Sequence, residues 1–388
     1  MFFCVEFIQI PVIFIKKQIS RKAKKKRKLF KDLIVIGITG SYGKTSTKEF
    51  LYTILSQKYN VLKTKGNNNT EIGVANTVLQ KLKKEHQIFI CEMGAYRIGE
   101  IKAICEIVKP KIGILTGINE QHIALFRSQE NIIKTKFELI ESLPEHGTAI
   151  LNSDNRYIKS KFENQDLKTQ IANLKFCSVK DKLDIWAENI KIKKDRIIFK
   201  IFSKDKDSAD FEVNLIGGQN IPNILLAVCC AKELGMKLNE ISEICKTLKP
   251  MPHQMELKKG INNLNIIDSS YSANSKSVIS HLDYLKIWEG KKVIIMPCLI
   301  ELGTEAKKIH QQIGEKISEV CDLAIITTKE YFEEIRRCNK IDKNKKTEIL
   351  FINNPDKIVE KIKNVCKKEQ DIILLESRVP KELLKQRN

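Results

Sequence analysis

The sequence predicts an α/β protein made of two domains, each with a mostly parallel sheet covered by helices. From residue 33 onward, short runs rich in Ile and Val alternate with segments of helical periodicity, which is the pattern of such a sheet. A break with two prolines, KPMPH at residues 249–253, separates this series from a second one. With 388 residues and 42% hydrophobic content, the chain is long enough to bury more than one core.

The first alternating series predicts the larger domain. Its expected strands are residues 33–39, 88–94 and 111–118, and its expected helices are residues 46–57, residues 98–108 and one that begins near Gln129. Residues 150–215 contain short alternating pieces, which are typical of an antiparallel insertion or an extension of the same sheet. Residues 216–236 predict a glycine turn into a buried helix that closes near Gly235.

The second series predicts a smaller, Rossmann-like domain. Its expected strands are residues 263–268, 291–297, 323–328, 347–352 and 371–377. We therefore expect three parts, namely a leader at residues 1–32, a central domain at residues 33–250 and a C-terminal domain at residues 251–388.

The first 32 residues differ in composition from the rest. They begin with the apolar stretch MFFCVEFIQIPVIFI and continue with a basic cluster, so that ten Lys or Arg residues stand against Glu6 and Asp32 and supply +8 of the net charge of +21. The apolar stretch is too short and too interrupted to predict a membrane span. It is typical of a peripheral contact with an anionic membrane surface, and a disordered basic leader is the alternative.

The remaining composition indicates a cytoplasmic protein without a nucleic-acid partner. Lys residues outside the leader are spread over helix faces with no aromatic residues between them, which favours a solvated surface. The eleven cysteines never form a Cys-x-x-Cys motif, and several lie in apolar runs. This pattern indicates reduced thiols and argues against structural zinc. We expect a monomer that can associate with the inner face of the membrane.

The clearest motif joins the first strand to the first helix, where a glycine loop ends in Gly-Lys-Thr. Backbone N–H groups of such a loop bind phosphate oxygens, the lysine reaches the terminal phosphates, and the threonine hydroxyl binds Mg²⁺. The motif predicts a MgATP site in a P-loop-like domain, although a strict P-loop would have glycine at Ile38, and a chance Gly-Lys-Thr is the alternative. The residues of the expected site are Gly40, Ser41, Gly43, Lys44, Thr45 and Ser46.

Three polar side chains follow the other two expected strands of this series. Glu92 ends the second strand, and Asn119 and His122 follow the third. Reactive groups of open parallel sheets gather at the carboxyl ends of the strands, so these residues should share an edge with the Gly-Lys-Thr loop. A carboxylate and an imidazole that face a phosphate loop can hold a second divalent cation.

Several longer motifs together resemble one enzyme family. They are TGSYGKTSTKE, KGNNNTEIGV (65–74), EMGAYRIGEI (92–101), TGINEQHIALF (116–126), TKFELI (135–140), GGQNIPN (217–223), DSSYSANSKS (268–277) and IELG (300–303). In these motifs the chain resembles the Mur ligases, most closely the MurF branch, from residue 33 to its end. The Gly-Glu-Ile at residues 99–101 favours this branch over the folylpolyglutamate synthases.

The resemblance implies an ATP-dependent ligase that joins an acid to an amine through an acyl phosphate. The MurF branch adds D-alanyl-D-alanine to a muramoyl tripeptide in peptidoglycan synthesis, so the implied partners are a muramoyl peptide and a dipeptide. Thr45 and Glu92 would bind the Mg²⁺ ion on the nucleotide side, and His122 would help to hold a second ion. The lysine that matches Lys136 is carbamylated in the family, and its carboxylate supports the second ion; an ordinary surface lysine is the alternative. Lys44, His122 and Lys136 are the implied catalytic residues.

Other matching positions are implied to bind substrate and nucleotide. Asn67, Asn69 and Thr70 correspond to substrate contacts, although consecutive asparagines are also common in turns. Asn220 and Asn223 correspond to residues that position adenine, and a helix cap is the alternative.

The chain departs from the family pattern at several positions. Gln219 and Gln254 replace an expected histidine and arginine, while the family's paired aspartates become Asp268 and Ser269, with Ser272 in place of an asparagine. Asp268 is then the acid left to bind the nucleotide. Residues 1–32 are also too few for the uridine-binding domain of the MurF branch. The alternatives are a ligase for another acceptor, as in the folylpolyglutamate synthases, or a catalytically weak nucleotide-binding paralogue at the membrane.

Overall fold

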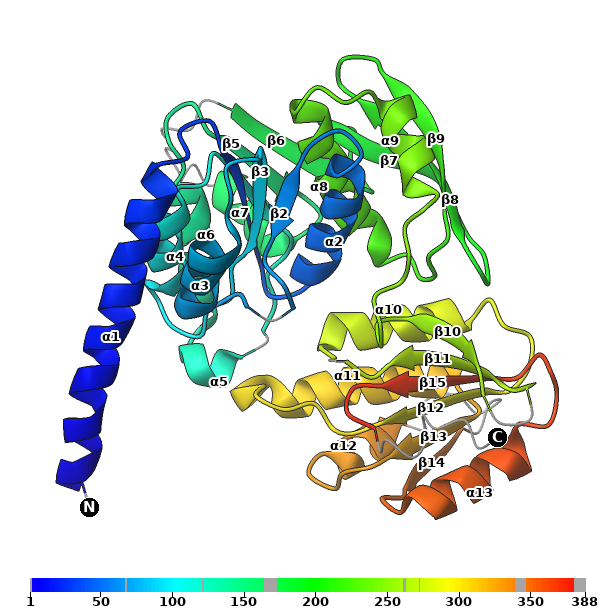
Figure 1. Cartoon of the computed structure of the whole chain (residues 1–388). Coiled ribbons are helices and arrows are strands. Elements are labelled where there is room, and N and C mark those ends of the chain that lie inside the picture. Colours follow the sequence, from blue (N-terminus) through cyan, green and yellow to red (C-terminus); the bar gives the residue numbers. More distant parts are fainter. Residues whose placement is uncertain are drawn as a thin grey trace. The chain divides into compact units, whose positions relative to one another are not determined.

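The computed structural model describes residues 2–66, 68–120, 122–163, 173–260, 263–271, 273–338 and 347–379, with side chains from residue 14 onward (Figure 1). Contacts between residues group the chain into two compact units. Unit 1 comprises Met1–Glu188, Lys200–Asp210 and Ile221–Cys245, and unit 2 comprises Asn189–Phe199, Phe211–Asn220 and Lys246–Asn388. The predicted α/β class, with a large mostly parallel sheet and a second smaller one, is confirmed.

The larger sheet, which lies mainly in unit 1, has nine strands in the order β2-β3-β1-β4-β5-β6-β7-β8-β9. Their bounds are β1 Ile34–Thr39, β2 Val61–Lys63, β3 Ile88–Glu92, β4 Ile112–Leu115, β5 Thr148–Asn152, β6 Asn173–Ser178, β7 Ile185–Ile192, β8 Ile197–Ser203 and β9 Ser208–Val213. Strand β1 pairs in parallel with β3 and with β4. All residues of β3 and β4 are buried, as expected for central strands with both faces covered.

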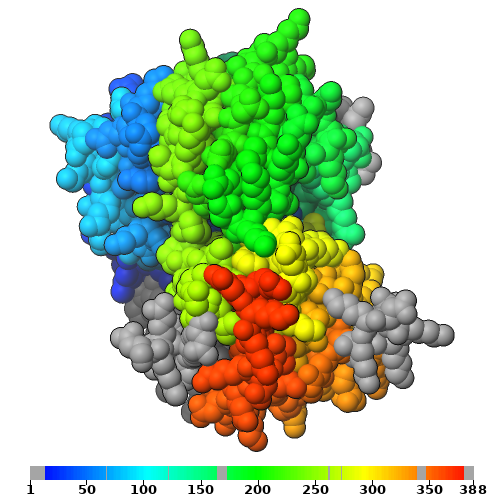
Figure 2. Space-filling model, turned by 90° about the vertical axis from the view of Figure 1, so that its right-hand side faces the viewer, coloured from blue at the N-terminus to red at the C-terminus, as the bar shows by residue number. Residues whose placement is uncertain are grey.

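The antiparallel arrangement expected within residues 150–215 is wrong for β6 and β7. Strand β6 pairs in parallel with β5 and with β7, and β8 and β9 then extend the same sheet. The alternating pattern indicates only that one face of a strand is covered and the other is solvated. A parallel strand far from the sheet centre also has one covered and one solvated face, so the pattern does not determine strand direction. Side chains of this end of the sheet form part of the molecular surface (Figure 2, green).

The helices of the first series cover this sheet. Helix α6 begins at Gln129 as predicted, because the Ser128 side chain accepts a hydrogen bond from the Asn131 N–H at 3.2 Å. Gly235, with φ of 83°, follows the end of α8 as expected. The bounds are α2 Lys44–Leu55, α3 Glu71–Lys81, α4 Glu100–Val108, α5 Ile123–Phe126, α6 Gln129–Glu141, α7 Arg156–Glu163, α8 Asn220–Glu233 and α9 Leu238–Cys245.

The basic leader forms a helix, α1 (Phe2–Lys28), whose C-terminal half packs lengthwise on α3 and α4 (Figure 1). Ala23 is fully buried in this contact, and the Ser20 hydroxyl donates to Glu71 at 2.6 Å. The alternative of a disordered basic leader is therefore wrong for residues 14–28. In the parts of the chain that the structure describes, every helix is too short or too polar to cross a membrane.

The smaller sheet has the strand order β10-β11-β15-β12-β13-β14. The five predicted strands of the second series are confirmed, and they pair in parallel, whereas β10 adds an unexpected antiparallel strand beside β11. Helices α10–α13 cover the sheet. The bounds are β10 Glu256–Lys259, β11 Asn265–Ser269, β12 Lys292–Met296, β13 Leu323–Ile326, β14 Glu348–Phe351, β15 Ile372–Glu376, α10 Ser275–Leu285, α11 Ala306–Val320, α12 Phe332–Arg337 and α13 Pro355–Val365.

Candidate active site

The glycine loop lies between the carboxyl end of β1 and the first turn of α2. A Cβ atom at Gly40 would lie 2.1 Å from Thr116 Oγ1, so the loop passes too close to the neighbouring strand end for any side chain. Gly43 precedes α2 with φ of 78°, a left-handed conformation that favours glycine. The loop therefore presents its backbone at the N-terminus of a twelve-residue helix, which is where phosphate groups bind.

Replacing Gly43 with alanine should weaken nucleotide binding more than it weakens the fold. The left-handed φ costs a residue with a side chain about 1–2 kcal/mol, and the new Cβ would lie 2.4 Å from Asn223 Oδ1. Gly235→Ala is a matched control, because Gly235 has φ of 83° and nothing within 4 Å of its Cβ position. We expect both variants to melt at lower temperature, and only Gly43→Ala to lose affinity for a fluorescent ATP analogue. Equal nucleotide affinities of the two variants would contradict this assignment of the loop.

Lys44 lies over the loop that precedes it. Its ammonium group donates to the carbonyl oxygens of Gly40 at 2.8 Å and of Ser41 at 3.3 Å. Burial lowers the pKa of Lys44, and the charge of Glu92 acts in the opposite direction. The ammonium group that would meet a terminal phosphate is thus held at the loop by two carbonyl oxygens.

Glu92, at the carboxyl end of β3, is the centre of the side-chain network beside the loop. The Thr45 hydroxyl lies 3.2 Å from both carboxylate oxygens. The Asn69 amide donates to Oε1 and the Lys48 ammonium donates to Oε2, each at 3.0 Å. Glu92 is 2% exposed and the Lys48 side chain is fully buried, so this is a buried ion pair with two further polar partners.

Two residues of this network, Lys48 and Asn69, do not have these roles among the residues predicted from the sequence. Lys48 stands four residues after Lys44 on α2, and residues at this spacing share a helix face. The spacing was therefore the available signal. Asn69 is predicted to contact substrate, and in the structure its amide donates to Glu92. Thr70 caps α3 by accepting a hydrogen bond from the Gly73 N–H at 3.3 Å, and Asn67 lies outside the described residues.

The paired oxygens of Thr45 and Glu92 fit one Mg²⁺ ion, because hard cations take hydroxyl and carboxylate ligands. A second cation needs more than the unmodified side chains provide. Across the described ranges, no three His, Cys, Asp or Glu side chains are grouped closely enough to hold a metal ion. Glu138, one of two acidic residues whose charges act on Lys136, accepts hydrogen bonds from the Gly99 and Lys102 N–H groups at the start of α4.

Lys136, on α6, is buried at 4% exposure, which contradicts the alternative of a surface lysine. Its ammonium lies 5.7 Å from the centre of the Phe126 ring. Burial and the charge of Lys44 lower the pKa of Lys136 to about 7. A substantial fraction of this amine is therefore uncharged near neutral pH.

His122 precedes α5 with φ of 65°, and its ring packs edge to face on the ring of Tyr96, with 5.4 Å between the ring centres.

Other predicted residues of the first series also lie at the loop. The backbone N–H of Ser41 donates to Gly117 O at 2.7 Å, and Ser41 Oγ accepts from the Asn119 N–H at 3.3 Å. Asn223 is buried, and its Oδ1 accepts from the Thr47 hydroxyl at 3.4 Å. Ser46 is half-buried in the first turn of α2. The structure thus brings Asn223 against the phosphate loop from a position far along the chain.

The remaining predicted nucleotide residues belong to unit 2. The Asn220 amide donates to Ile216 O at 3.0 Å. Asp268 has no exposed surface and bonds Lys258 Nζ at 2.7 Å and His253 Nδ1 at 2.8 Å. Burial acts to raise the pKa of Asp268, but hydrogen bonds from Lys258, Ser270 and His253 hold it below its usual value. Asp268 is consequently an ionised carboxylate between two basic side chains.

The position that departs from the family's second aspartate is part of a buried cluster. Ser269 Oγ lies 3.3 Å from His281 Nδ1, which lies 2.7 Å from Glu376 Oε2. Residue 269 thus lacks the carboxylate of the family pattern, and the carboxylate in this cluster is that of Glu376 on β15. Ser272, the other departure in this segment, lies outside the described residues.

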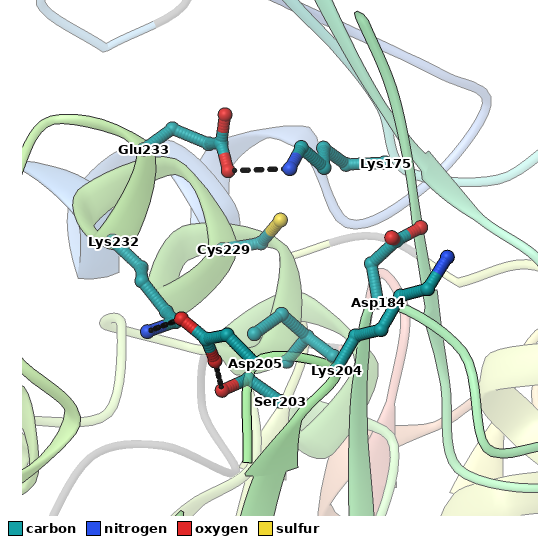
Figure 3. A pocket seen from close by; sticks show the side chains of 9 residues that line it. Lys175, Asp184, Ser203, Lys204, Asp205, Cys229, Lys232 and Glu233 are labelled. Carbon is teal, nitrogen blue, oxygen red and sulfur yellow. Dashed lines mark hydrogen bonds and ion pairs between the residues drawn. The ribbon is translucent and has the colours of Figure 1, made fainter. Parts of the chain in front are cut away.

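A separate cavity of about 280 Å³ lies between α8 and strands β6–β8 (Figure 3). Ion pairs cross its rim, with Lys175 at 3.0 Å from Glu233 and Lys232 at 2.8 Å from Asp205. None of the predicted site residues is among those that line it. The cavity is therefore distinct from the candidate active site at the phosphate loop.

Comparison with known proteins identifies the family. The sequence profile of the Mur ligase middle domain matches residues 38–231, and that of the Mur ligase glutamate ligase domain matches residues 253–378. The UDP-N-acetylmuramoyl-tripeptide–D-alanyl-D-alanine ligase of Buchnera aphidicola subsp. Acyrthosiphon pisum is 30% identical over 345 residues, which cover 88% of this chain and 72% of that protein.

Two further proteins extend the comparison. The Escherichia coli ligase of the same name is 32% identical over 287 residues, covering 72% of this chain but only 61% of that protein, so the chain spans about three fifths of this relative. The crystal structure of the MurF ligase of Thermotoga maritima in complex with ADP superposes with a TM-score of 0.82 at 25% identity, covering 94% of this chain and 80% of that one. Together with the loop geometry, these matches show that this chain belongs to the Mur ligase family.

Proposed function

We propose that this protein is an ATP-dependent C–N ligase of the MurF type that joins a D-alanyl-D-alanine-like dipeptide to a muramoyl peptide in peptidoglycan precursor synthesis. The observation that carries the proposal is the buried group at the phosphate loop, where Thr45 meets Glu92 at 3.2 Å beside Lys44. The names of the relatives and the ADP complex of a similar fold support both the nucleotide and the reaction.

The proposed reaction activates a carboxylate by phosphorylation. A carboxylate oxygen of the acceptor attacks the γ-phosphorus of ATP, the bond to ADP breaks, and an acyl phosphate forms. The amine nitrogen then attacks the acyl carbon, phosphate leaves with its bonding electrons, and the amine loses a proton. Lys44 and the N–H groups at the start of α2 would bind the phosphate oxygens, and Thr45 and Glu92 would hold Mg²⁺, which neutralises phosphate charge.

We also propose that Lys136 is carbamylated by CO₂ and that its carbamate, with His122, holds a second Mg²⁺ ion. Burial and the charge of Lys44 support this modification, because an ammonium group there is poorly solvated whereas the neutral amine can react. The modification would place oxygen ligands at the buried end of the Lys136 side chain. Asn223 and Asp268 remain proposed nucleotide residues, and Asn69 is proposed to act through Glu92.

Phosphate release should require both proposed substrates. Purified full-length protein with MgATP in bicarbonate buffer is expected to release phosphate only when UDP-N-acetylmuramoyl-tripeptide and D-alanyl-D-alanine are both present. The product should have the summed mass of the two substrates less one water. Lys44→Ala, which removes the ammonium at the loop, serves as the inactive control.

Two other results would replace the proposal. Turnover with folate and glutamate, but not with the peptide pair, would favour a folylpolyglutamate-like ligase. Tight ATP binding without turnover for any pair would favour a binding-only paralogue, in line with Gln219, Gln254 and Ser269. We also propose that the protein is a cytoplasmic monomer; the free, buried thiols of the described residues are in keeping with a reducing compartment. The contact of its leader with a membrane is a separate proposal that does not depend on this chemistry.

A further inference from the structure

The basic residues of α1 fall into two sets with different surroundings. One set attaches the helix to unit 1: Lys24 pairs with Glu106 at 2.6 Å, and Lys26 and Arg27 donate to backbone carbonyl oxygens of α3 and α4 at 2.8 and 2.9 Å. The other set is exposed and has no hydrogen bond or ion pair with any residue that the structure describes. It consists of Lys16, Lys17, Arg21, Lys22, Lys25 and Lys28.

Four members of the exposed set form a stripe along the helix. Lys17, Arg21, Lys25 and Lys28 are spaced four, four and three residues apart, so they share one face. Ser20 and Ala23, which are buried against unit 1, lie on another face. We call these four residues the cationic stripe. Because the C-terminal half of α1 is attached to unit 1, the stripe is held on the side of the helix that faces away from this contact.

The same helix carries exposed apolar side chains directly before the stripe. Phe14 is 59% exposed and Ile15 is 55% exposed, and the preceding residues of the sequence, MFFCVEFIQIPVI, are also mainly apolar. On a soluble domain, a contiguous patch of exposed apolar side chains with charged residues at its rim indicates an interaction site. An apolar segment followed at once by a cationic face is the arrangement of helices that lie in a membrane interface.

We propose that α1 holds this protein on an anionic lipid bilayer. The apolar segment that ends at Phe14 and Ile15 enters the headgroup region, and the cationic stripe contacts lipid phosphates. Charge complementarity favours this partner, since no cation of the stripe has a counter-ion among the residues that the structure describes. A second copy of α1 would be repelled by the same stripe. A nucleic acid would satisfy the cations but would leave the apolar segment in water.

The proposal can be tested with full-length protein and flotation of vesicles, without any measurement of ligase activity. The vesicles contain phosphatidylcholine alone or an equal mixture of phosphatidylcholine and phosphatidylglycerol. The first variant is K17E/R21E/K25E/K28E, which reverses the stripe. The matched control is K84E/K191E/K307E/K308E, which makes the same change in net charge at four exposed lysines outside α1. The third variant, F14S/I15S, removes exposed apolar groups only.

The wild-type protein and the matched control should float with the anionic vesicles and not with phosphatidylcholine alone. Reversal of the stripe should lower the partition coefficient on the order of 100-fold, because each basic residue near an anionic surface contributes several-fold to binding. F14S/I15S should bind more weakly than wild type and should become more sensitive to salt. Thermal melting checks that all variants fold alike, as expected for changes at exposed positions.

Three results would overturn the proposal. Equal losses for the stripe variant and the matched control would mean that only net charge matters. Equal binding to neutral vesicles would remove the role of the stripe. Stronger binding to duplex DNA than to anionic vesicles, unaffected by F14S/I15S but lost in the stripe variant, would assign the stripe to nucleic acid.

Discussion

Replacing Lys136 with alanine is expected to reduce the proposed ligase turnover by about two to four orders of magnitude, the range found when a group that stabilises transferring charge is removed. The loss follows from the buried position of the amine, since no three His, Cys, Asp or Glu side chains in the described ranges are grouped closely enough to hold a cation without it. Lys134→Ala is the matched control, because Lys134 is exposed on the same helix. Steady-state phosphate release in bicarbonate buffer measures the difference.

Short carboxylic acids and pH give two further readouts of the same prediction. Acetate or formate should partly restore Lys136→Ala, because either can supply a carboxylate in the space left by the lysine. In wild-type protein, ¹³C-labelled bicarbonate should give a carbamate signal that Lys136→Ala lacks. Only the neutral amine reacts with CO₂, and burial lowers the pKa of Lys136 to about 7. The signal should therefore increase from about pH 6 to about pH 8. Full turnover of Lys136→Ala without added acid would refute the carbamate.

Replacing Lys48 with methionine is expected to lower the free energy of unfolding of unit 1 by about 3–5 kcal/mol, as found when one partner of a buried ion pair is removed. Lys48 is fully buried and lies 3.0 Å from Glu92, which is 3% exposed by its side chain. Methionine fills a similar volume but leaves the carboxylate with only neutral donors, Thr45 and Asn69. Lys175→Met is the matched control, because that lysine of unit 1 pairs with Glu233 at a partly exposed position, where such pairs contribute little.

Tryptophan fluorescence can follow unit 1 by itself. The chain has two tryptophans, of which Trp186 belongs to unit 1 and Trp288 to unit 2. Urea unfolding in a Trp288→Phe background therefore reports the unit that contains Lys48. The double variant K48M/E92Q should be more stable than the sum of the two single losses predicts, because it removes both charges together. Additive losses would mean that the ion pair contributes nothing beyond its separate parts.

Much of the fold could be predicted because the sequence patterns that indicate its strands and helices lie within each element. Buried central strands such as β3 and β4 are continuous apolar runs, and α6 begins at Gln129 because Ser128 caps it. The glycine loop could be recognised for the same reason, since its conformation depends on adjacent glycines. The direction of β6 could not be predicted, because strand direction depends on the connection between strands and alternation reports only which face is covered.

The α/β class, the Gly-Lys-Thr loop and the position of Glu92 beside Thr45 follow from local sequence patterns, because apolar periodicity and the strand-end rule need no knowledge of distant contacts. The full set of side chains at the site depends on contacts between segments that are far apart in the chain. Lys48 and Asn69 both bond Glu92 from other segments of the chain. Asn223 contacts the phosphate loop from α8. Some basic residues of α1 bond unit 1, whereas others are exposed to solvent. Each of these contacts joins residues that are far apart in the chain. Whether such a contact forms depends on which neighbour each side chain is buried against, and residue type alone does not specify that neighbour.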